Sequence, residues 1–332
     1  MEDIQTVATL YRIHLQQVRQ ITDNLFYISD GDNAFAVKKS NVSNERMQLW
    51  LQTYTIISNL QLDFMMPILL TNDGQLFVYV NDKIYYIMPW INDHKTYRVK
   101  KIFRLLGQLH VKTKHPYEYK QSFEIPLNSF KDECNDAFKF IYQTIEQFER
   151  KYYMSPFELQ VCTHFHNIEK VFKHILYYID DFNDECQKQI EWHYSLCHGY
   201  LQLDHIISAE QMYFINWERA HFTHPIKDLI HFLKQANQMN NLRDALMNDF
   251  SSYLEENRLF RHEYILLFIY LLNPSTYVNT IKQHIQQRER IDHHVINDVI
   301  SLERAYRQLH FGLKWIDHFE KAFVTTLDEI DD

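Results

Sequence analysis

Two clusters of polar residues, each following a short apolar run, stand out in the stretch 195–233 as the residues best placed to do chemistry. The first cluster is His198-Gly199-Tyr200 with Asp204-His205 after it, and the second is Asn216-Trp217-Glu218. The pattern predicts a loop, a strand, a turn, a second strand and then a helix. A hairpin of this kind returns the second cluster to the first, so one site can receive polar groups from two directions. Gly199 is one of only five glycines, and its place beside a histidine indicates a backbone that needs unusual freedom.

This pattern resembles the catalytic core of the aminoglycoside phosphotransferase and choline kinase-like families. In those families the first loop reads His-Gly-Asp, an Asn follows five residues after the Asp, and the hairpin returns an Asp within Ile-Asp-Trp-Glu. Here His198 and Gly199 match, but Tyr200 stands at the position of the catalytic base. His205 stands in place of the Asn, and Asn216 in place of the metal-binding Asp. The chain therefore has the frame of this catalytic core but lacks three of its chemical groups.

The three replacements weaken phosphoryl transfer for physical reasons. The reaction depends on a carboxylate that takes the acceptor's proton and on an Asp and an Asn that hold Mg²⁺ against the phosphates. Tyr200 is a poor base because a tyrosine hydroxyl has a reference pKa of about 10, and loss of a general base typically costs roughly 10²- to 10⁴-fold in rate. Mg²⁺ prefers anionic oxygens, whereas Asn216 offers a neutral carbonyl and His205 a nitrogen. The sequence thus predicts no catalytic residues, with Tyr200, His205 and Asn216 as degenerate positions.

Other matched residues are predicted to hold the frame. Pro225-Ile226-Lys227-Asp228-Leu229 resembles the family's Asp-Pro-x-x-Asp-Leu element, whose second Asp steadies the loops behind the active site. A structural role is accordingly predicted for five residues: His198, Gly199, Trp217, Glu218 and Asp228.

Further residues are predicted to face a nucleotide cleft. Lys38 closes Ala36-Val37-Lys38, which resembles the strand that carries the phosphate-pairing lysine of kinase-like folds, although a solvated strand-end lysine gives the same pattern. Glu45, at the start of a predicted helix over 44–59, is either an ion-pair partner of Lys38 or a first-turn acid favoured by the helix dipole. Met88 opens the segment 88–91, which is either a nucleotide-contacting hinge or a plain connection.

The spacing of apolar residues predicts the elements around these positions. A short helix is expected over 1–20 and five antiparallel strands over 25–28, 34–38, 66–69, 76–80 and 84–90. Beyond residue 92 the pattern is helical, with amphipathic stripes such as the one through Ile168, Val171 and Ile175. We therefore predict an α+β, protein kinase-like two-lobed fold. Its small β-sheet lobe would span 1–91, and its helical lobe 92–332 would carry the degenerate catalytic loop 195–233.

Composition excludes several classes of protein. Of the 332 residues, 46% are hydrophobic and 15% aromatic, which excludes a disordered chain. The net charge of −9 argues against a general nucleic-acid binder, and the most apolar run, 264–272, is too short to span a bilayer. The N-terminus lacks the apolar segment of a signal peptide, and the four cysteines are dispersed, so we expect a protein with reduced thiols that is made in the cytoplasm. The 19 histidines show no zinc-binding spacing, and no metal site is predicted.

The length, the 22 tyrosines and 23 phenylalanines, and the segment LLNPSTY resemble the spore-coat CotS family, including the YutH-like coat-associated proteins of endospore-forming Gram-positive bacteria. This resemblance implies a pseudokinase without a cofactor that acts as a structural or scaffolding protein in endospore formation. Its partners would be other spore coat proteins, and it would be made in the mother cell and deposited in the coat.

Two alternatives remain at this point. One is an atypical small-molecule phosphotransferase that uses ATP and Mg²⁺, with Glu218, Asp204 and Asn216 around the metal. The other is a regulatory module that binds a nucleotide through Lys38 without a metal.

Overall fold

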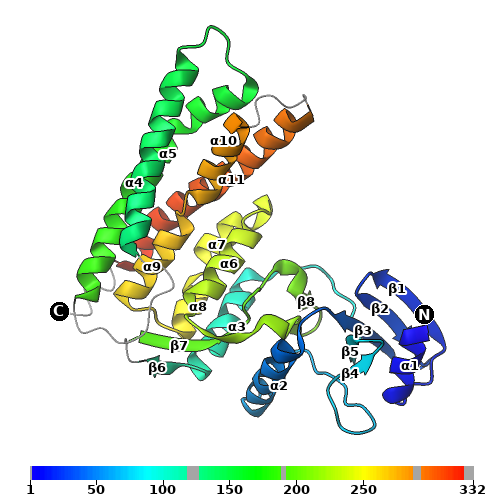
Figure 1. The fold of residues 1–332 in the computed structure, drawn as a ribbon. Helices are drawn as coiled ribbons and strands as arrows, with labels where there is room; N and C mark the ends of the chain where they lie inside the picture. Colours follow the sequence, from blue (N-terminus) through cyan, green and yellow to red (C-terminus); the bar gives the residue numbers. More distant parts are fainter. Residues whose placement is uncertain (1, 118–126, 188–191, 287–292, 325–332) are drawn as a thin grey trace. The chain divides into compact units, whose positions relative to one another are not determined.

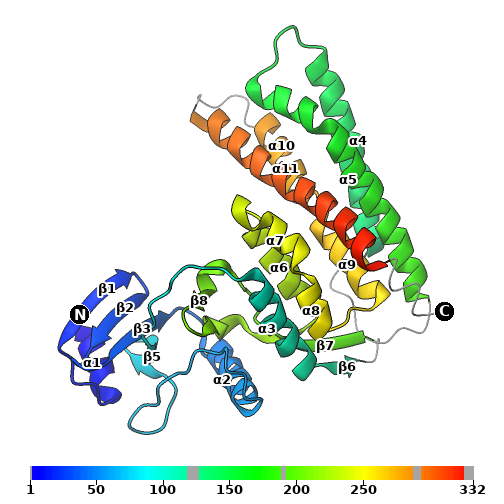
Figure 2. The ribbon, with the colours of Figure 1, turned by 180° about the vertical axis from the view of Figure 1, so that it is seen from behind.

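The computed structural model describes residues 2–117, 127–187, 192–286 and 293–324, and the chain forms two compact units (Figures 1 and 2). The sheet unit consists of Met1–Arg98 together with Ser195–Thr223, and the helical unit consists of Val99–Tyr194 together with His224–Asp332. Both polar clusters found in the sequence therefore belong to the sheet unit, although about a hundred residues separate them from its other segment.

A five-stranded antiparallel sheet organises the sheet unit, in the order β1-β2-β3-β5-β4. Number and direction of the strands agree with the prediction, but one member differs, because the first strand lies at residues 17–22 and none forms over 66–69. The strands are β1 (Gln17–Thr22), β2 (Leu25–Ser29), β3 (Ala34–Ser40), β4 (Val78–Val80) and β5 (Lys83–Pro89).

The first helix is shorter than predicted, since α1 spans Glu2–Leu10. Its end is set by Arg12, which has a left-handed backbone with φ of 57°, and by the Ile13 N–H, which donates to the Ala8 carbonyl at 2.9 Å. A left-handed residue followed by such a back-reaching bond is a common helix terminator. The prediction of helix up to residue 20 is therefore wrong, and the chain is free to enter β1.

The segment 66–69, predicted as a strand, instead divides its backbone bonds between two partners. Leu69 N–H donates to the Ile87 carbonyl at 2.9 Å, and Met66 N–H donates to the Phe214 carbonyl at 3.3 Å. Pro67 between them has no N–H to give to a ladder. The segment consequently links the sheet to the stretch that carries the polar clusters.

The two faces of the sheet have different neighbours. Val37 and Ile87 are fully buried and belong to a core that includes Ile4 and Val7 of α1, which lies beside the strands in Figure 1. In the β3–β5 register, Lys38 lies opposite Tyr86 and Ala36 opposite Met88. Because side chains alternate between faces along a strand, Lys38, Tyr86 and Met88 share the other face of the sheet.

Helix α2 (Asn44–Asn59) has the predicted bounds and packs on the face of the sheet that carries Lys38 and Tyr86. Its N-terminus is capped by Ser43, whose hydroxyl accepts a hydrogen bond from the Arg46 N–H at 3.3 Å. Trp50 on α2 packs on Tyr86, with the ring centroids 5.1 Å apart. The cap thus fixes the helix start, and the aromatic contact fixes the helix against the face that carries Lys38.

The stretch with the polar clusters is a series of short elements. β8 and β9 pair as an antiparallel hairpin. Ser195–Cys197 of β7 pair with β10 inside the sheet unit, and Trp192–Tyr194 of the same strand pair with β6 inside the helical unit. The elements are β6 (His115–Tyr117), β7 (Trp192–Cys197), η1 (Leu203–His205), β8 (Ile206–Ser208), β9 (Met212–Phe214), η2 (Trp217–Arg219) and β10 (His221–Thr223).

The helical unit is built from long helices that lie side by side, with α5 between α4 and α11 in both views (Figures 1 and 2). α5 starts with a capping box in which Ser155 and Glu158 satisfy each other's backbone N–H groups, and Pro156 follows the cap. The helices are α3 (Val99–Lys112), α4 (Leu127–Glu149), α5 (Pro156–Cys186), α6 (Ile226–Ala236), η3 (Asn240–Leu242), α7 (Arg243–Asn248), α8 (Ser251–Glu256), α9 (Arg261–Leu271), α10 (Ser275–Gln286), α11 (His293–Phe319) and the final turn η4 (Glu320–Val324).

An antiparallel sheet followed by a mostly helical part confirms the predicted α+β class. None of the described helices is long and apolar enough to cross a membrane.

Candidate functional site

Four side chains of the sheet unit meet at one polar cluster, which we call the Lys38 cluster: Lys38, Tyr86, Asn216 and Glu218. The Lys38 ammonium donates to Asn216 Oδ1 and lies 3.9 Å from Glu218 Oε1. The Tyr86 hydroxyl donates to the same Glu218 oxygen at 2.6 Å. Lys38 and Tyr86 reach Glu218 together because they are opposite each other across β3 and β5.

Burial governs the electrostatics of this cluster. Loss of water lowers the pKa of Lys38, while the neighbouring Glu218 carboxylate opposes that shift. The pKa of Tyr86 is raised well above its ordinary value, first by burial and then by Glu218, so its hydroxyl keeps the proton that it donates. Glu218 itself is buried. The cluster is therefore a largely desolvated cation and anion, in which Lys38 donates to the neutral Asn216 and the neutral Tyr86 donates to Glu218.

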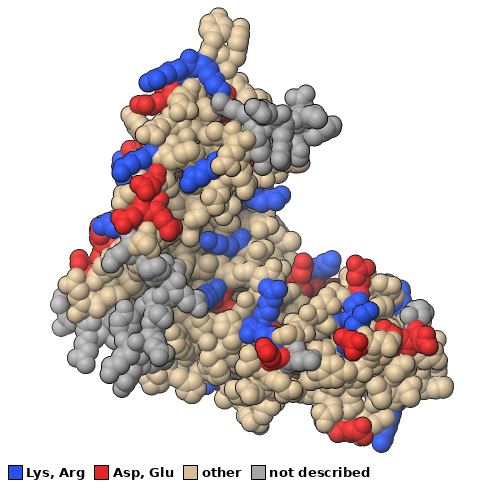
Figure 3. Space-filling view, in the orientation of Figure 1, with Lys and Arg blue, Asp and Glu red and all other residues tan. Residues whose placement is uncertain are grey.

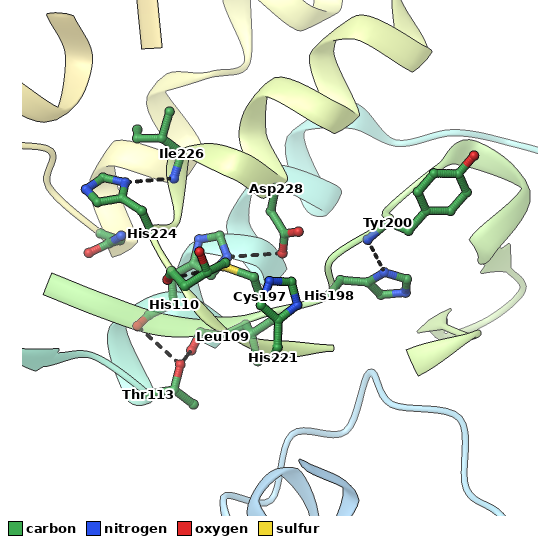
Figure 4. Close-up of polar contacts among 12 residues, drawn as sticks. Leu109, His110, Thr113, Cys197, His198, Tyr200, His221, His224, Ile226 and Asp228 are labelled. Carbon is green, nitrogen blue, oxygen red and sulfur yellow. Dashed lines mark hydrogen bonds and ion pairs between the residues drawn. The ribbon is translucent and has the colours of Figure 1, made fainter. Parts of the chain in front are cut away.

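His198 joins the first loop to the hairpin that follows it. Its ring is fully buried, and Nε2 donates to the Ile215 carbonyl at 2.8 Å. Nδ1 accepts from the Tyr200 N–H at 3.4 Å, which assigns the ring proton to Nε2 (Figure 4). Trp217 packs on the same ring at 4.8 Å between centroids and donates its indole N–H to the Phe214 carbonyl at 2.9 Å. These contacts hold two loops in one arrangement.

Gly199 is required both by its dihedral angle and by its surroundings. Its φ is 77°, a conformation that other residues rarely adopt. A Cβ at this position would lie 2.3 Å from the Arg219 carbonyl oxygen and 3.1 Å from His221 Nδ1. The glycine thus lets the loop after β7 approach the backbone that follows η2.

Tyr200 and His205 are joined by a hydrogen bond within their own loop. His205 Nδ1 donates to the Tyr200 carbonyl at 2.8 Å, and burial, together with His198 and Lys38, lowers the pKa of His205 to about 4. The Tyr200 ring points away from His198 in Figure 4 and lies under the Arg219 guanidinium, 4.6 Å from the ring centroid. Neither residue presents a carboxylate at the position where the families that the sequence resembles have a base.

Arg46 and the backbone of Asn216 place η2 next to α2. Arg46 donates to the Glu218 carbonyl at 3.1 Å and to the Arg219 carbonyl at 2.6 Å. Asn216 has φ of 66° and ψ of 49°, a left-handed conformation that asparagine tolerates better than most residues. The turn and the arginine together aim the Asn216 and Glu218 side chains at Lys38.

The other residues singled out in the sequence lie in different settings. Met88 is buried on the same face of the sheet as Lys38, whereas Glu45 is exposed in the first turn of α2 and Lys38 pairs with Glu218 instead. Asp204 is exposed on η1. Asp228 belongs to the helical unit, where it is buried with its Oδ2 3.4 Å from His110 Nε2 (Figure 4). The nucleotide contacts proposed for Lys38, Glu45 and Met88 stay predictions.

Tyr86 of the Lys38 cluster and Arg46, which contacts the backbone of η2, were not predicted as site residues from the sequence. Tyr86 could have been found from the β3–β5 register, but these strands are separated by α2 and its following segment, so no hairpin fixes their register in the sequence. No motif signals Arg46, whose role depends on carbonyl groups more than a hundred residues away along the chain.

The donor atoms do not fit a Mg²⁺ ion as they are arranged. Asn216 Oδ1 accepts from the Lys38 ammonium, and Glu218 Oε1 accepts from Tyr86 and faces the same ammonium. Mg²⁺ needs octahedral oxygen ligands, and here both oxygens already face a cation supplied by the chain. The Lys38 cluster thus has its own positive charge where a metal site would need an open position.

Charges of both signs are interspersed on the face of the molecule drawn in Figure 3. On the face drawn in Figure 3, Lys and Arg side chains alternate with Asp and Glu among the coloured residues, and these form no continuous basic patch. This distribution suits the net charge of −9.

Comparisons with known proteins place the fold. No protein-family model matches the chain, and no curated protein sequence matches it. Among solved structures, it is similar to an aminoglycoside phosphotransferase from Alicyclobacillus acidocaldarius subsp. acidocaldarius DSM 446, with 15% identity, a TM-score of 0.69 and 96% of each chain covered.

Two further solved structures are similar to the chain in fold. A spectinomycin phosphotransferase in complex with ADP and spectinomycin has 13% identity and a TM-score of 0.58, covering 94% of this chain and 97% of its own. A microcompartment-associated aminopropanol kinase has 10% identity and a TM-score of 0.54, covering 95% and 97%. The chain therefore has the protein kinase-like fold found in aminoglycoside phosphotransferases and other small-molecule kinases.

Proposed function

We propose that this protein is a pseudokinase that serves as a structural or scaffolding protein. The observation that carries the proposal is the Lys38 cluster, in which Asn216 and Glu218 engage the lysine that would otherwise pair with phosphates. A nucleotide would have to replace contacts that are buried and already satisfied. Such replacement costs free energy because a desolvated charge pair is strongly destabilised when one partner is withdrawn.

The degenerate positions support the same proposal. Tyr200 and His205 are joined through the Tyr200 carbonyl, and His205 is held neutral by its surroundings. A tyrosine hydroxyl at position 200 is a poor base compared with a carboxylate, and neither His205 nor Asn216 carries a negative charge to neutralise a metal. The residues at these three positions stabilise the loops and supply neither a catalytic base nor metal ligands.

Thermal unfolding with ATP and Mg²⁺ tests the proposal. A ligand that binds the folded state raises its Tm in proportion to the logarithm of its concentration over Kd. We expect no Mg²⁺-dependent shift with millimolar ATP, and no ATP turnover. A metal-dependent rise in Tm together with turnover that disappears in Glu218→Ala would contradict the proposal.

Restoring the family's residues gives a sharper experiment. The triple variant Tyr200→Asp, His205→Asn, Asn216→Asp returns the base and both metal ligands to a frame that the chain already has. We expect Mg²⁺-dependent stabilisation by ATP in the triple variant but not in the single variant Tyr200→Asp, which regains the base without the metal ligands. Equal stabilisation of the unmodified protein and the triple variant would show that the three positions do not determine binding.

We also propose the setting in which the scaffold acts. The resemblance to the CotS and YutH-like proteins supports a role in the spore coat, with other coat proteins as partners and synthesis in the mother cell. A fluorescent fusion expressed during sporulation of an endospore-forming Gram-positive host should form a shell around the forespore. Diffuse fluorescence throughout the mother cell would count against a coat role.

A second candidate is the atypical small-molecule phosphotransferase with Asp204, Asn216 and Glu218 near a metal. It is favoured by one observation, the retention of a lysine at β3 that reaches the second polar cluster. The solved structures with this fold include enzymes that act on small molecules, one of them in complex with ADP. The phosphotransferase should show a Mg²⁺-dependent rise in Tm with ATP and turnover that disappears in Glu218→Ala. A rise in Tm that persists in EDTA and vanishes in Lys38→Ala would instead indicate the regulatory module that binds a nucleotide without a metal.

A further inference from the structure

A cavity of about 480 Å³ lies within the helical unit, separate from the residues of the Lys38 cluster. Its lining comes from the start of α5, from the segment between α6 and α7, from the first residue of α7, and from the middle of α11. The volume falls within the range of small-molecule binding sites in proteins. The lining includes Gln160, Arg243, Glu303, Arg304, Arg307 and Gln308.

The charged side chains of this cavity are mainly arginines. Three arginines and a single glutamate line it, a formal charge of 3 − 1 = +2 in a chain whose net charge is −9. The glutamate is already engaged, because Glu303 Oε1 accepts from Arg307 Nε at 2.6 Å and Oε2 lies 3.4 Å from His164 Nε2. The cavity is therefore locally positive, against the charge of the whole protein.

Two of the arginines lack a counter-charge. Among the described residues, no carboxylate lies within 4.0 Å of the Arg243 or Arg304 guanidinium. Arg243 is held in place by neutral groups, since its Nε donates to the Asn237 side chain at 2.9 Å and to the Asn237 carbonyl at 3.3 Å. A guanidinium offers five donors in a planar fork that matches phosphate or carboxylate oxygens. These two side chains can bind an anion without first breaking an ion pair.

The neutral lining residues indicate the rest of the ligand. Gln160 Oε1 and Gln308 Nε2 are buried atoms without a hydrogen-bond partner in the part of the chain that the structure describes. One is an acceptor and the other a donor, and both residues line the cavity. An unpaired buried polar atom destabilises the folded protein, so a ligand that pairs both atoms gains affinity. Hydroxyl groups of a ligand can pair with both atoms, because each hydroxyl can donate and accept a hydrogen bond.

We propose that this cavity binds a small phosphorylated polyol or sugar. The phosphate is held by Arg243 and Arg304, and hydroxyl groups of the ligand pair with Gln160 and Gln308. A phosphate monoester carries a charge of about −1.5 to −2 at pH 7, which matches the charge of the lining residues. The inference concerns only residues of the helical unit, so it stands or falls independently of the pseudokinase proposal.

Isothermal titration of the full-length protein tests the site with glucose 6-phosphate, ribose 5-phosphate and glycerol 3-phosphate as probes. Glucose and inorganic phosphate separate the two halves of the ligand. We expect at least one ester to bind tenfold or more tightly than both inorganic phosphate and glucose. The binding should weaken as salt concentration rises, as expected for an anion held by guanidinium groups.

Variants assign the binding to the cavity. Arg304 is exposed, so Arg304→Gln should fold normally and lower affinity for the ester at least tenfold. Arg150→Gln, which removes an exposed arginine of the same unit outside the cavity, is the matched control and should leave affinity unchanged. Gln308→Met should weaken the ester but not inorganic phosphate, because it removes a partner of the hydroxyl groups alone.

The proposal fails under any of three outcomes. No ester binds at millimolar concentration, or Arg304→Gln and Arg150→Gln bind the ester equally, or inorganic phosphate binds as tightly as every ester. A fourth result, binding of a hexaglutamate peptide in preference to all the esters, would also overturn it and would indicate a docking site for an acidic protein segment.

Discussion

At the scale of single residues, Gly199 offers a direct test of how tightly the two polar loops are packed. Gly199→Ala adds a Cβ that would lie 2.3 Å from the Arg219 carbonyl oxygen, at a φ of 77°. Gly74→Ala is a matched control because its φ is 75° and nothing lies within 4 Å of the added Cβ. We expect the control to lose about 1 kcal/mol of unfolding free energy and Gly199→Ala to lose roughly 2–4 kcal/mol.

Urea unfolding of both alanine variants measures the difference. Equal losses would show that only the backbone conformation matters at Gly199 and that the loop after β7 can move away from Arg219. A larger loss for Gly199→Ala assigns the excess to the close approach of the two loops.

His205 should make the stability of the protein depend on pH. Its pKa is lowered from 6.5 to about 4 in the folded state, chiefly by burial. The unfolded state therefore takes up a proton first, and the stability that neutral His205 contributes above pH 6.5 is lost as pH falls through about 4. A shift of this size corresponds to at most about 3 kcal/mol, and partial exposure reduces it to roughly 1–2 kcal/mol.

The variant His205→Gln isolates this contribution, because it removes the titration and keeps a donor for the Tyr200 carbonyl. The unfolding free energy of the unmodified protein minus that of the variant should be larger at pH 7.5 than at pH 4 by about 1–2 kcal/mol. Other titrating groups cancel in this difference. A difference that does not change with pH would mean that His205 has the same pKa in the folded and unfolded states.

Sequence reasoning identified residues such as Lys38, His198 and Asn216 because short motifs carry their identity. It could not give their partners. One of the two interpretations of Glu45 pairs it with Lys38, seven positions before it, yet the structure pairs Lys38 with Glu218, 180 positions on. Partners of that kind depend on which loops fold against which strands, and a motif contains no such information.

At the scale of elements, the β3–β5 register determines which hydroxyl reaches the Lys38 cluster. Tyr86→Phe removes a buried hydroxyl that donates to Glu218 at 2.6 Å, and should cost about 1.5–3 kcal/mol of unfolding free energy. Tyr85 is the adjacent residue on the other face, and its hydroxyl donates at 3.0 Å to Asp3, which has a solvated carboxylate. Tyr85→Phe should therefore cost about 0.5–1 kcal/mol.

Chemical unfolding of the two phenylalanine variants provides the comparison, since each keeps a buried ring and loses one oxygen. If Tyr85→Phe is the more costly change, the bond between Tyr86 and Glu218 contributes little, and the account of the Lys38 cluster as a satisfied buried network is wrong.

Elements with a strong local signal were predictable from the sequence. Helix α2 has its predicted bounds because Ser43 and the apolar spacing after it act locally. The sheet contains β1 instead of the strand predicted over 66–69, and the sequence could not show this. The difference depends on a left-handed Arg12 that ends α1 and on a backbone hydrogen bond from Met66 to Phe214. The first is a rare conformation for arginine, and the second is a contact with a distant segment.

At the scale of the whole molecule, the sheet unit is assembled from two segments that are far apart in the chain. The second segment is attached by backbone bonds as well as by side chains. Phe214 N–H donates to the Phe64 carbonyl at 2.6 Å, and His94 N–H donates to the Ser208 carbonyl at 2.9 Å. A boundary placed at residue 91, where the sequence pattern changes from strands to helices, groups only residues that are adjacent in the sequence and so leaves this segment out.

This assembly predicts the pattern of native-state hydrogen exchange. Amides of Met66, His94 and Phe214 should exchange with the same free energy as the β3–β5 ladder amides of Val37 and Ile87, because breaking their bonds requires the sheet unit to open as a whole. Gly199→Ala should then lower protection of the ladder amides as much as that of Phe214, although no ladder residue contacts Gly199 in the close approach described above. If the variant lowers protection only within 195–223, that segment opens by itself. The Lys38 cluster would then be a contact between two independent elements, and a nucleotide could gain access to Lys38 without unfolding the sheet.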